Sequence, residues 1–190
     1  ERGACPDAEE YGFKERFSNK TAIAPTASIS IICGGASPGV EPVAANSYTH
    51  KTLSGSFNVK NRYLIKILAK YKKNDDEIWS SITTNQGSVE HLDFLTKNEK
   101  DVFKTAFEID QKWIIELGAD RTANVSQAQS INIFLPADVH KKELHQIHFQ
   151  AWKKGLKSLY YCRSKSIQRA ENVNNSLPTN VTKNQSNESK

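Results

Sequence analysis

Two neighbouring phenols, Tyr160 and Tyr161, are the side chains of this sequence best suited to redox chemistry. A phenol can lose an electron and a proton together, and with a pKa of about 10 it stays neutral between such events. Two stacked rings would pass an oxidising equivalent along without large movements. Neighbouring strand residues point to opposite faces, so we expect at least one hydroxyl to leave the apolar side. Core or interface packing is the simpler alternative for the pair.

A second candidate site is the run Pro25-Thr26-Ala27-Ser28-Ile29. A proline at the first helical position followed by small hydroxyl residues predicts a helix start. The free N–H groups of a first helical turn favour an anion, and small side chains let it approach closely. The run therefore predicts a phosphate cradle that needs neither a metal nor a lysine, and a capped helix start without a ligand is the simpler alternative.

The spacing of histidine and cysteine residues predicts no metal site. His145 and His148 are three residues apart, but no carboxylate or cysteine completes a set of ligands, so we expect them and His140 to be surface or half-buried helix residues. The odd number of cysteines and the absence of CxxC spacing argue against a secreted disulfide framework. The three cysteines are Cys5, Cys33 and Cys162.

The composition allows one ordinary domain: 190 residues, of which 37% are hydrophobic, can form a sizeable core. A net charge of +5 favours anionic partners, but Lys and Arg are spread along the chain, so a nucleic-acid stripe is disfavoured. No apolar run approaches the roughly 18 residues that span a bilayer, and no signal peptide opens the chain. We therefore expect a reducing, cytoplasmic setting.

The first half of the sequence predicts mostly short elements. Residues 21–24 read as a short extended approach to Pro25, and the glycines of 34–39 predict a turn. Residues 47–59 suggest extended structure with a turn at Ser54 and Gly55. A helix capped by Asn61 is expected next, followed by a second helix. Their inward residues are expected to be Leu64, Ile67, Leu68 and Tyr71, then Ile78, Trp79 and Ile82.

The second half predicts alternating helices and strands. One long helix is expected from a Thr96 capping box to a stop at Gly118, although Asp110 interrupts its apolar stripe. A strand at 130–135 and a strand at 159–162 flank a helix, which implies parallel pairing and an α/β layer or barrel. That last helix is expected to be capped by Asp138 and to end at Gly155, and its inward face is expected to carry Leu144, Ile147, His148, Ala151 and Trp152.

Three segments of the chain together resemble the C-terminal part of the large, catalytic subunit of class I ribonucleotide reductase. They are the run from Pro25 to Ile29, the segment Gly39-Val40-Glu41-Pro42, and the stretch from Gly155 to Tyr161. The resemblance covers residues 1–169. It implies the C-terminal part of a ten-stranded α/β barrel over residues 1–171, and the Asn- and Ser-rich residues 172–190 are expected to form a flexible, disordered tail.

The resemblance also implies roles for these residues. The run from Pro25 to Ile29 would bind the diphosphate of a ribonucleoside diphosphate. Tyr161 would receive a radical from a metal-containing small subunit, and Tyr160 would pass it inward to an active-site cysteine. The thiyl radical would remove the 3′ hydrogen, the 2′ hydroxyl would leave as water, and a cysteine pair would supply the electrons. Glu41 is interpreted as structural, because no acid/base partner is near it in sequence.

Other parts of the implied enzyme have no counterpart in the sequence. The active-site cysteines do not map onto any cysteine here, so this segment alone should be inactive, and its barrel is incomplete. We expect no cofactor on the segment itself, ATP and dNTP effectors bound elsewhere, a homodimer of large subunits, and thioredoxin or glutaredoxin as reductant in deoxyribonucleotide synthesis for DNA replication. No membrane or direct nucleic-acid contact is expected.

Two alternatives stay open. The first is a relative with the same barrel that uses adenosylcobalamin or a glycyl radical, which would need no tyrosine relay. The second is a non-catalytic basic module that binds a nucleotide or RNA through the Pro25 loop. Aromatic residues interleaved with basic ones would support that module, whereas here the aromatic residues follow core spacing.

Overall fold

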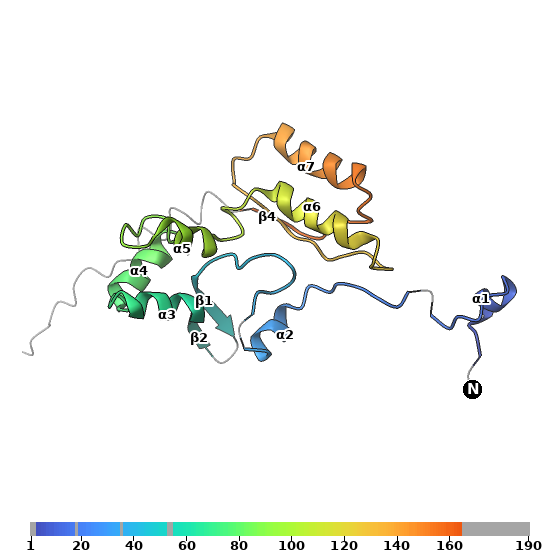
Figure 1. The fold of residues 1–190 in the computed structure, drawn as a ribbon, viewed down its shortest axis with the longest axis horizontal. Helices are drawn as coiled ribbons and strands as arrows, with labels where there is room; N and C mark the ends of the chain where they lie inside the picture. Colours follow the sequence, from blue (N-terminus) through green and yellow to red (C-terminus); the bar gives the residue numbers. More distant parts are fainter. Residues whose placement is uncertain (1–2, 18, 35, 53–54, 165–190) are drawn as a thin grey trace, which may run out of the picture.

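The computed structural model describes residues 3–17, 19–34, 36–52 and 55–164 (Figure 1). The predicted tail at 172–190 lies outside the described residues. Within the described ranges, no helix combines the length and apolar character needed to cross a membrane. The elements in chain order are α1 (Pro6–Glu10), α2 (Ala27–Ile32), β1 (Ser47–Thr52), β2 (Gly55–Lys60), α3 (Arg62–Lys70), α4 (Asp76–Thr84), α5 (Lys97–Val102), α6 (Gln111–Thr122), β3 (Ile133–Leu135), α7 (Lys141–Lys153) and β4 (Cys162–Ser164).

Helix α3 begins where the Asn61 side chain accepts hydrogen bonds from the backbone N–H groups of Tyr63 and Leu64, at 3.0 and 3.4 Å. Leu64 and Leu68, four residues apart, are fully buried on one face of the helix. Complete burial of a leucine side chain stabilises a fold by about 1.5–3 kcal/mol. The predicted helix with its Asn61 cap is confirmed.

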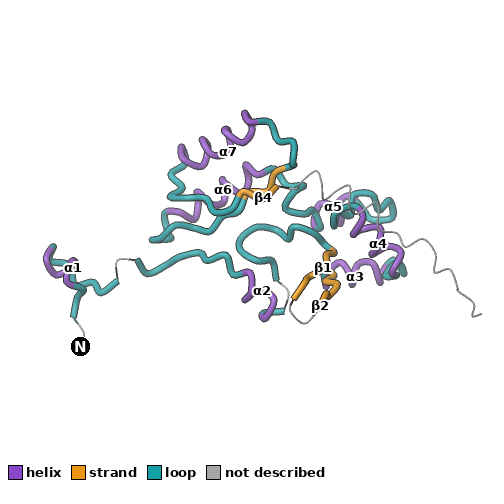
Figure 2. The backbone as a smooth tube through the Cα atoms, turned by 180° about the vertical axis from the view of Figure 1, so that it is seen from behind, coloured by secondary structure: helices purple, strands orange, loops and turns teal. Residues whose placement is uncertain are grey.

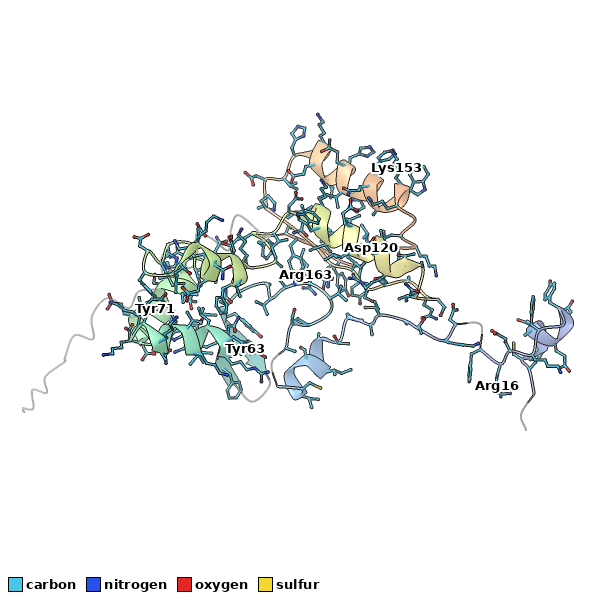
Figure 3. The ribbon with its side chains drawn as sticks, viewed as in Figure 1. Arg16, Tyr63, Tyr71, Asp120, Lys153 and Arg163 are labelled. Carbon is cyan, nitrogen blue, oxygen red and sulfur yellow. The ribbon has the colours of Figure 1, made fainter. Side chains whose placement is uncertain are left out.

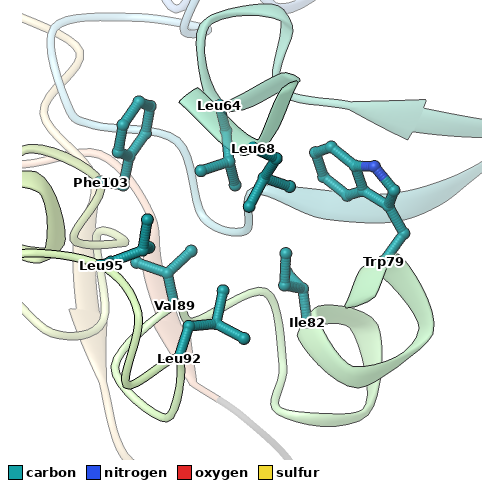
Figure 4. Packing of buried hydrophobic residues seen from close by; sticks show 8 residues of the cluster. All are labelled: Leu64, Leu68, Trp79, Ile82, Val89, Leu92, Leu95 and Phe103. Atoms are coloured by element: carbon teal, nitrogen blue, oxygen red, sulfur yellow. The ribbon is translucent and has the colours of Figure 1, made fainter. Parts of the chain in front are cut away.

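Helix α4 packs against α3 and completes the first core. Its N-cap is Asp75, whose carboxylate accepts from the N–H of Ile78 at 2.9 Å. Trp79 is buried as predicted, and its indole N–H donates to Asn74 at 2.8 Å. Figure 4 shows this cluster from close by; its members are Leu64, Leu68, Trp79, Ile82, Val89, Leu92, Leu95 and Phe103.

Strands β1 and β2 form an antiparallel hairpin, which confirms the predicted extended structure over 47–52 and 55–59. Ser54 of the predicted turn lies outside the described residues. Its base closes at two asparagines. The N–H of Asn61 donates to the Asn46 carbonyl, and the Asn61 side chain donates to the Asn46 side-chain oxygen, both at 2.8 Å. The buried Asn46 amide in turn donates to the carbonyls of Gly87 and Phe103, at 3.0 and 2.7 Å. The hairpin is thereby tied to the helical core.

The prediction of one long helix over 96–118 is wrong, because the chain forms two helices, α5 and α6, separated by 103–110. Thr96 and Glu99 make the predicted capping box at the start of α5. Asp110, which interrupts the apolar stripe, is the N-cap of α6, and its side chain accepts from the backbone N–H two residues later at 2.9 Å. The interruption therefore marks a new helix start.

Helix α6 lies close against β3 for two reasons. Gly118 is inside the helix, and a Cβ atom there would lie 2.7 Å from Cδ1 of Ile131, so this glycine permits close approach and is not the predicted stop. The buried Gln111 side chain accepts from the N–H of Phe134 at 2.8 Å. It also donates to two carbonyls of the preceding segment, at 2.9 and 2.7 Å.

Strands β3 and β4 pair in parallel, with Ile133 opposite Cys162, and α7 forms the crossover between them. The α/β layer with parallel pairing is confirmed, but the predicted bounds of both strands are wrong. Strand β3 begins at Ile133 and not at residue 130, and β4 begins at Cys162, so Tyr160 and Tyr161 precede it. Helices α6 and α7 lie side by side against this short sheet (Figures 1 and 2). The second core forms between them, from Ile114, Ile115, Ile131, Ile133, Leu135, Ile147 and Ala151.

Helix α7 differs from its prediction at its start and on one face. Its N-cap is His140 and not Asp138, because the His140 ring Nδ1 accepts from the N–H of Lys142 at 3.1 Å. Trp152 is 72% exposed and His148 is also exposed, so their predicted inward placement is wrong. Leu144, Ile147 and Ala151 already form the apolar stripe of the helix. His148 and Trp152 each follow a residue of that stripe by one position, which turns them toward solvent.

Candidate functional site

Parallel backbone pairing links the segment before the Pro25 loop to the segment that carries Tyr160 and Tyr161. Ile23 forms a parallel bridge with Gln129, and the N–H of Ser130 donates to the Ile23 carbonyl at 2.9 Å. Strand β3 follows directly and pairs with β4 on its other side. The extended approach predicted at 21–24 is therefore a neighbour of the chain that leads into β3.

The candidate phosphate loop turns the chain from this extended segment into α2. The helix begins at Ala27, so the prediction that Pro25 is the first helical residue is wrong. Between them, Thr26 has a φ of +47°, a left-handed conformation that is rare for a β-branched residue. The Thr26 carbonyl accepts from the N–H of Ser30 at 2.9 Å. A strained Thr26 therefore makes the sharp turn that we expected from the proline.

The loop presents its first-turn groups to solvent. Ala27, Ser28 and Ile29 are exposed, and first-turn N–H groups of a helix have no acceptor within the helix. Thr26 is half-buried, and its hydroxyl oxygen accepts from the N–H of Gly39 at 3.1 Å. The Thr26 O–H can still donate. The loop can therefore offer two hydroxyl groups and several backbone N–H groups to an anion.

Glu41 is buried beside this loop, with only 3% of its surface exposed. Its Oε1 accepts from the backbone N–H of Asn132, and its carbonyl accepts from the Ser37 hydroxyl. A Cβ atom at Gly39, whose φ is +83°, would lie 2.6 Å from Glu41 Oε2. The close fit of the carboxylate against a glycine agrees with the structural interpretation of Glu41.

The two tyrosine rings lie against each other. Their centroids are 4.1 Å apart with an interplanar angle of 52°, and the Tyr160 O–H donates to Tyr161 Oη at 3.4 Å. Tyr160 is 46% exposed and Tyr161 is 53% exposed. The prediction that the two side chains point to opposite faces is therefore wrong, and both hydroxyls share one accessible site.

The backbone explains why neighbouring residues share one side. In a regular parallel ladder, a single residue opposite Asn132 would donate to the carbonyl of Ile131 and accept from the N–H of Ile133. Here the N–H of Tyr160 donates to the Ile131 carbonyl at 2.8 Å, whereas the carbonyl of Tyr161 accepts from the N–H of Ile133 at 2.9 Å. Two residues therefore stand opposite one, as in a β-bulge, a distortion that re-aims side chains.

The pKa of Tyr160 is raised above its usual value of 10.0, mainly because its hydroxyl is hydrogen-bonded to Tyr161. Arg163, labelled in Figure 3, lies over the Tyr161 ring with its guanidinium carbon 5.3 Å from the ring centroid. Its positive charge acts in the opposite direction on the Tyr160 pKa and lowers it. The first effect is the larger one, so Tyr160 is held as a neutral phenol that can give up an electron and a proton together.

The histidines of α7 have contacts of their own. His145 stacks on Phe149 with ring centroids 5.9 Å apart, and His148 Nδ1 lies 2.8 Å from the Leu144 carbonyl. Among the described residues, no group of three or more His, Cys, Asp or Glu side chains could hold a metal ion. Cys33 and Cys162 are exposed and Cys5 is half-buried, all as free thiols.

Two large open cavities lie away from the loop and the tyrosine pair. One of about 1000 Å³ lies between the residues before α6, the end of β3 and the start of α7. Another, of about 790 Å³, is formed by residues 5–19 together with Gln127. Neither of these two cavities is lined by residues of the Pro25 loop or by the tyrosine pair.

Comparison with known proteins decides which family this arrangement represents. Residues 5–162 match the family model described as the ribonucleotide reductase barrel domain. The chain belongs to this family. The α subunit of a class Id ribonucleotide reductase from Actinobacillus ureae matches the structure with a TM-score of 0.73 and 39% sequence identity. That match covers 86% of this chain and 29% of the α subunit, which confirms the predicted barrel fold.

Curated relatives of this ribonucleotide reductase chain are much longer than it is. The large subunit of ribonucleoside-diphosphate reductase from Invertebrate iridescent virus 6 is 54% identical over 164 residues, which cover 84% of this chain and 17% of that protein. The large subunit from Invertebrate iridescent virus 3 is 45% identical, with 84% and 26% covered. The Caenorhabditis elegans large subunit is 38% identical, with 72% and 17% covered. The chain thus corresponds to a portion of such subunits.

Two residues around the site, Asn132 and Arg163, were not predicted from the sequence. The contact of Asn132 with Glu41 joins segments far apart in the chain, and no local pattern indicated it or the contact of Arg163 with the Tyr161 ring. Glu41 itself was interpreted as structural, but its partner Asn132 was not identified.

Proposed function

We propose that this chain supplies the C-terminal part of the catalytic barrel of a ribonucleoside-diphosphate reductase large subunit. The whole enzyme would convert ribonucleoside diphosphates into 2′-deoxyribonucleoside diphosphates. The names of the curated relatives support this activity. The observation that carries it is the contact between the rings of Tyr160 and Tyr161, with their oxygens 3.4 Å apart. This contact suits a relay, and the two alternatives have no use for it.

The loop from Pro25 to Ile29 would hold the substrate diphosphate. Its support is the first turn of α2, where Ala27, Ser28 and Ile29 are exposed, and the Thr26 hydroxyl, which accepts from Gly39 and has its own proton to donate. Backbone N–H groups at a helix start favour anions, and hydrogen bonds to a charged acceptor are stronger than those to a neutral one. Neither a lysine nor a metal ion is required for this binding.

The tyrosine pair would carry the oxidising equivalent. A metal-containing small subunit would supply the radical. Tyr161 would lose an electron and a proton, and it would then recover both from Tyr160 across the 3.4 Å contact. Tyr160 would in turn take an electron and a proton from a cysteine thiol outside this chain. The raised pKa keeps Tyr160 protonated at neutral pH, so that a proton is available to leave with each electron.

The remaining parts of the proposed enzyme lie outside this chain. We propose a homodimer of large subunits in the cytoplasm, ATP and dNTP effectors bound elsewhere in the subunit, and thioredoxin or glutaredoxin as the reductant. None of the three thiols here takes the role of the active-site cysteines. The segment alone would be inactive.

The test is CDP reduction by the complete gene product with its small subunit, with Tyr160→Phe compared with the wild type. Phenylalanine keeps the ring but has no O–H to lose, so we expect turnover to fall at least about a hundredfold with unchanged small-subunit binding. Tyr63→Phe, which changes an exposed tyrosine on α3, is the matched control. Retained turnover in Tyr160→Phe would make the pair structural and would favour a relative that generates its radical in another way.

A further inference from the structure

A buried contact between Glu41 and Asn132 lies on the edge of β3 away from the tyrosine pair. Both residues are more than nine-tenths buried, and the backbone N–H of Asn132 donates to Glu41 Oε1. Glu41 Oε2 and the Asn132 side-chain oxygen have no hydrogen-bond partner among the described residues. A carboxylate buried this deeply destabilises a fold unless its hydrogen bonds compensate, so the contact needs a physical explanation.

The register of the sheet gives Asn132 a special position. It is the single residue opposite the two tyrosines, since Ile131 and Ile133 on either side of it bind Tyr160 and Tyr161 through the backbone. Backbone groups of successive strand residues point to opposite edges, so the Asn132 N–H faces away from the tyrosines. Glu41 satisfies that N–H at an edge where no further strand pairs with Asn132 among the described residues.

The same glutamate is also connected to the candidate phosphate loop. Gly39, two residues before Glu41, donates its N–H to the Thr26 hydroxyl at 3.1 Å, and Glu41 Oε2 lies 2.6 Å from the place that a Cβ atom of residue 39 would occupy. The Ser37 hydroxyl donates to the Glu41 carbonyl and closes the turn. One continuous set of contacts therefore runs from Thr26 through Gly39 and Glu41 to Asn132.

We propose that Glu41 is a positioning residue that fixes the tyrosine bulge and the Thr26 loop relative to each other. By holding the Asn132 N–H, it keeps β3 in the register that places two tyrosines opposite one residue. By packing against Gly39, it keeps the Thr26 turn at a fixed place beside that strand. The effect of Glu41 on turnover rests on the proposed function, whereas the effect of Glu41 on the backbone does not.

The role requires a hydrogen-bond acceptor and not a negative charge. Glutamine keeps an acceptor oxygen at the same distance along the side chain and carries no charge. Leucine has a similar volume but leaves the Asn132 N–H buried without a partner. Glu41→Gln and Glu41→Leu therefore separate the two possibilities, and Glu77→Leu on the exposed face of α4 is the matched control.

The experiment measures amide hydrogen exchange and CDP reduction on the complete gene product, with its small subunit added for the assay. In Glu41→Leu we expect exchange at 131–133 and 160–161 to become at least about tenfold faster, with protection elsewhere unchanged. We expect kcat to fall about tenfold or more, because the tyrosine rings depend on that backbone. Glu41→Gln and Glu77→Leu should exchange and turn over like the wild type.

Each other outcome contradicts the proposal. Unchanged exchange at 131–133 and 160–161 in Glu41→Leu would show that the contact positions nothing. Loss of protection throughout the chain would make Glu41 a general core residue. If Glu41→Gln behaved like Glu41→Leu, the charge would matter and not the acceptor. Should the wild type fail to reduce CDP while Glu41→Leu shows the local change, the positioning role would stand and the proposed function would fail.

Discussion

The Tyr160 hydroxyl donates a hydrogen bond to Tyr161 Oη at 3.4 Å, and this bond raises the pKa of Tyr160 above 10.0. Its neutral form is therefore favoured in the folded state. That contribution to stability is fully present below the unfolded pKa of about 10 and is lost as the pH rises through the higher folded pKa. Tyr63 is the opposite case, because its hydrogen bond with Arg62 lowers its pKa.

Tyr161→Phe should move the Tyr160 pKa back toward 10.0, because the hydrogen bond that raises it is lost. The change can be followed as phenolate absorbance during titration from pH 8 to 12, a range that brackets the usual value of about 10, with Tyr160→Phe to identify the transition. Tyr63→Phe should instead remove a transition whose pKa is lowered from the usual value of 10.0 by the hydrogen bond with Arg62. A Tyr160 transition that does not move in Tyr161→Phe would contradict the hydrogen-bonded pair.

Thr26→Val combined with Ser28→Ala should raise KM for CDP about tenfold or more with a smaller change in kcat, because hydrogen bonds to a charged phosphate are lost. Ser28→Ala alone removes only an exposed hydroxyl, whereas Thr26→Val also removes the acceptor for the Gly39 N–H. The single variant therefore separates loss of binding from distortion of the loop.

The matched control for this double variant is Ser80→Ala with Thr84→Val, which removes the same groups from exposed positions of α4. Its KM should equal that of the wild type. An unchanged KM in the Thr26 and Ser28 variant would remove both residues from the substrate site.

Gly39→Ala should destabilise the fold by about 1–3 kcal/mol, because a Cβ atom would adopt a left-handed φ and would also lie 2.6 Å from Glu41 Oε2. Gly155→Ala has a similar φ of +79° but no atom within 4 Å, so it carries only the backbone strain. Denaturant unfolding measures the free energy of unfolding of both variants. Equal losses in the two variants would show that the carboxylate does not pack against Gly39.

Asp110→Ala should lower the free energy of unfolding by about 1 kcal/mol, because the N-cap of α6 would lose its acceptor. Asp120, labelled in Figure 3, lies in the same helix and is exposed, so Asp120→Ala removes an identical carboxylate away from the cap. Its unfolding free energy should stay within about 0.5 kcal/mol of the wild type. If the two variants lost equal stability, the cap would not be the start of α6.

The sequence predicted elements whose signals are local. The Asn61 and Thr96 caps bind backbone groups within three residues, so their spacing alone identifies the helix starts. Asp110 was misread because apolar residues continued at helical spacing on both sides of it, although two helices meet there. Local spacing cannot distinguish an interrupted helix from two helices when the loop between them is also partly buried.

The candidate site was less predictable because its geometry comes from distant contacts. The motifs identified Thr26, Ser28 and the tyrosine pair, but not how they are held. The shared orientation of Tyr160 and Tyr161 depends on hydrogen bonds to Ile131 and Ile133, some thirty residues earlier. Strand alternation gave the wrong orientation, since it assumes a regular ladder.

The paired asparagines at the base of the hairpin have a consequence for how this protein can vary. Asn46 and Asn61 are hydrogen-bonded to each other through both backbone and side chain. The two ends of the hairpin are therefore held together where the chain leaves the helical core and returns to it. Extra length at the tip of β1 and β2 would add only a small loop-closure cost and would not move that point. The hairpin is therefore where this barrel segment can accept an insertion or a reporter tag while α3 and α4 keep their places.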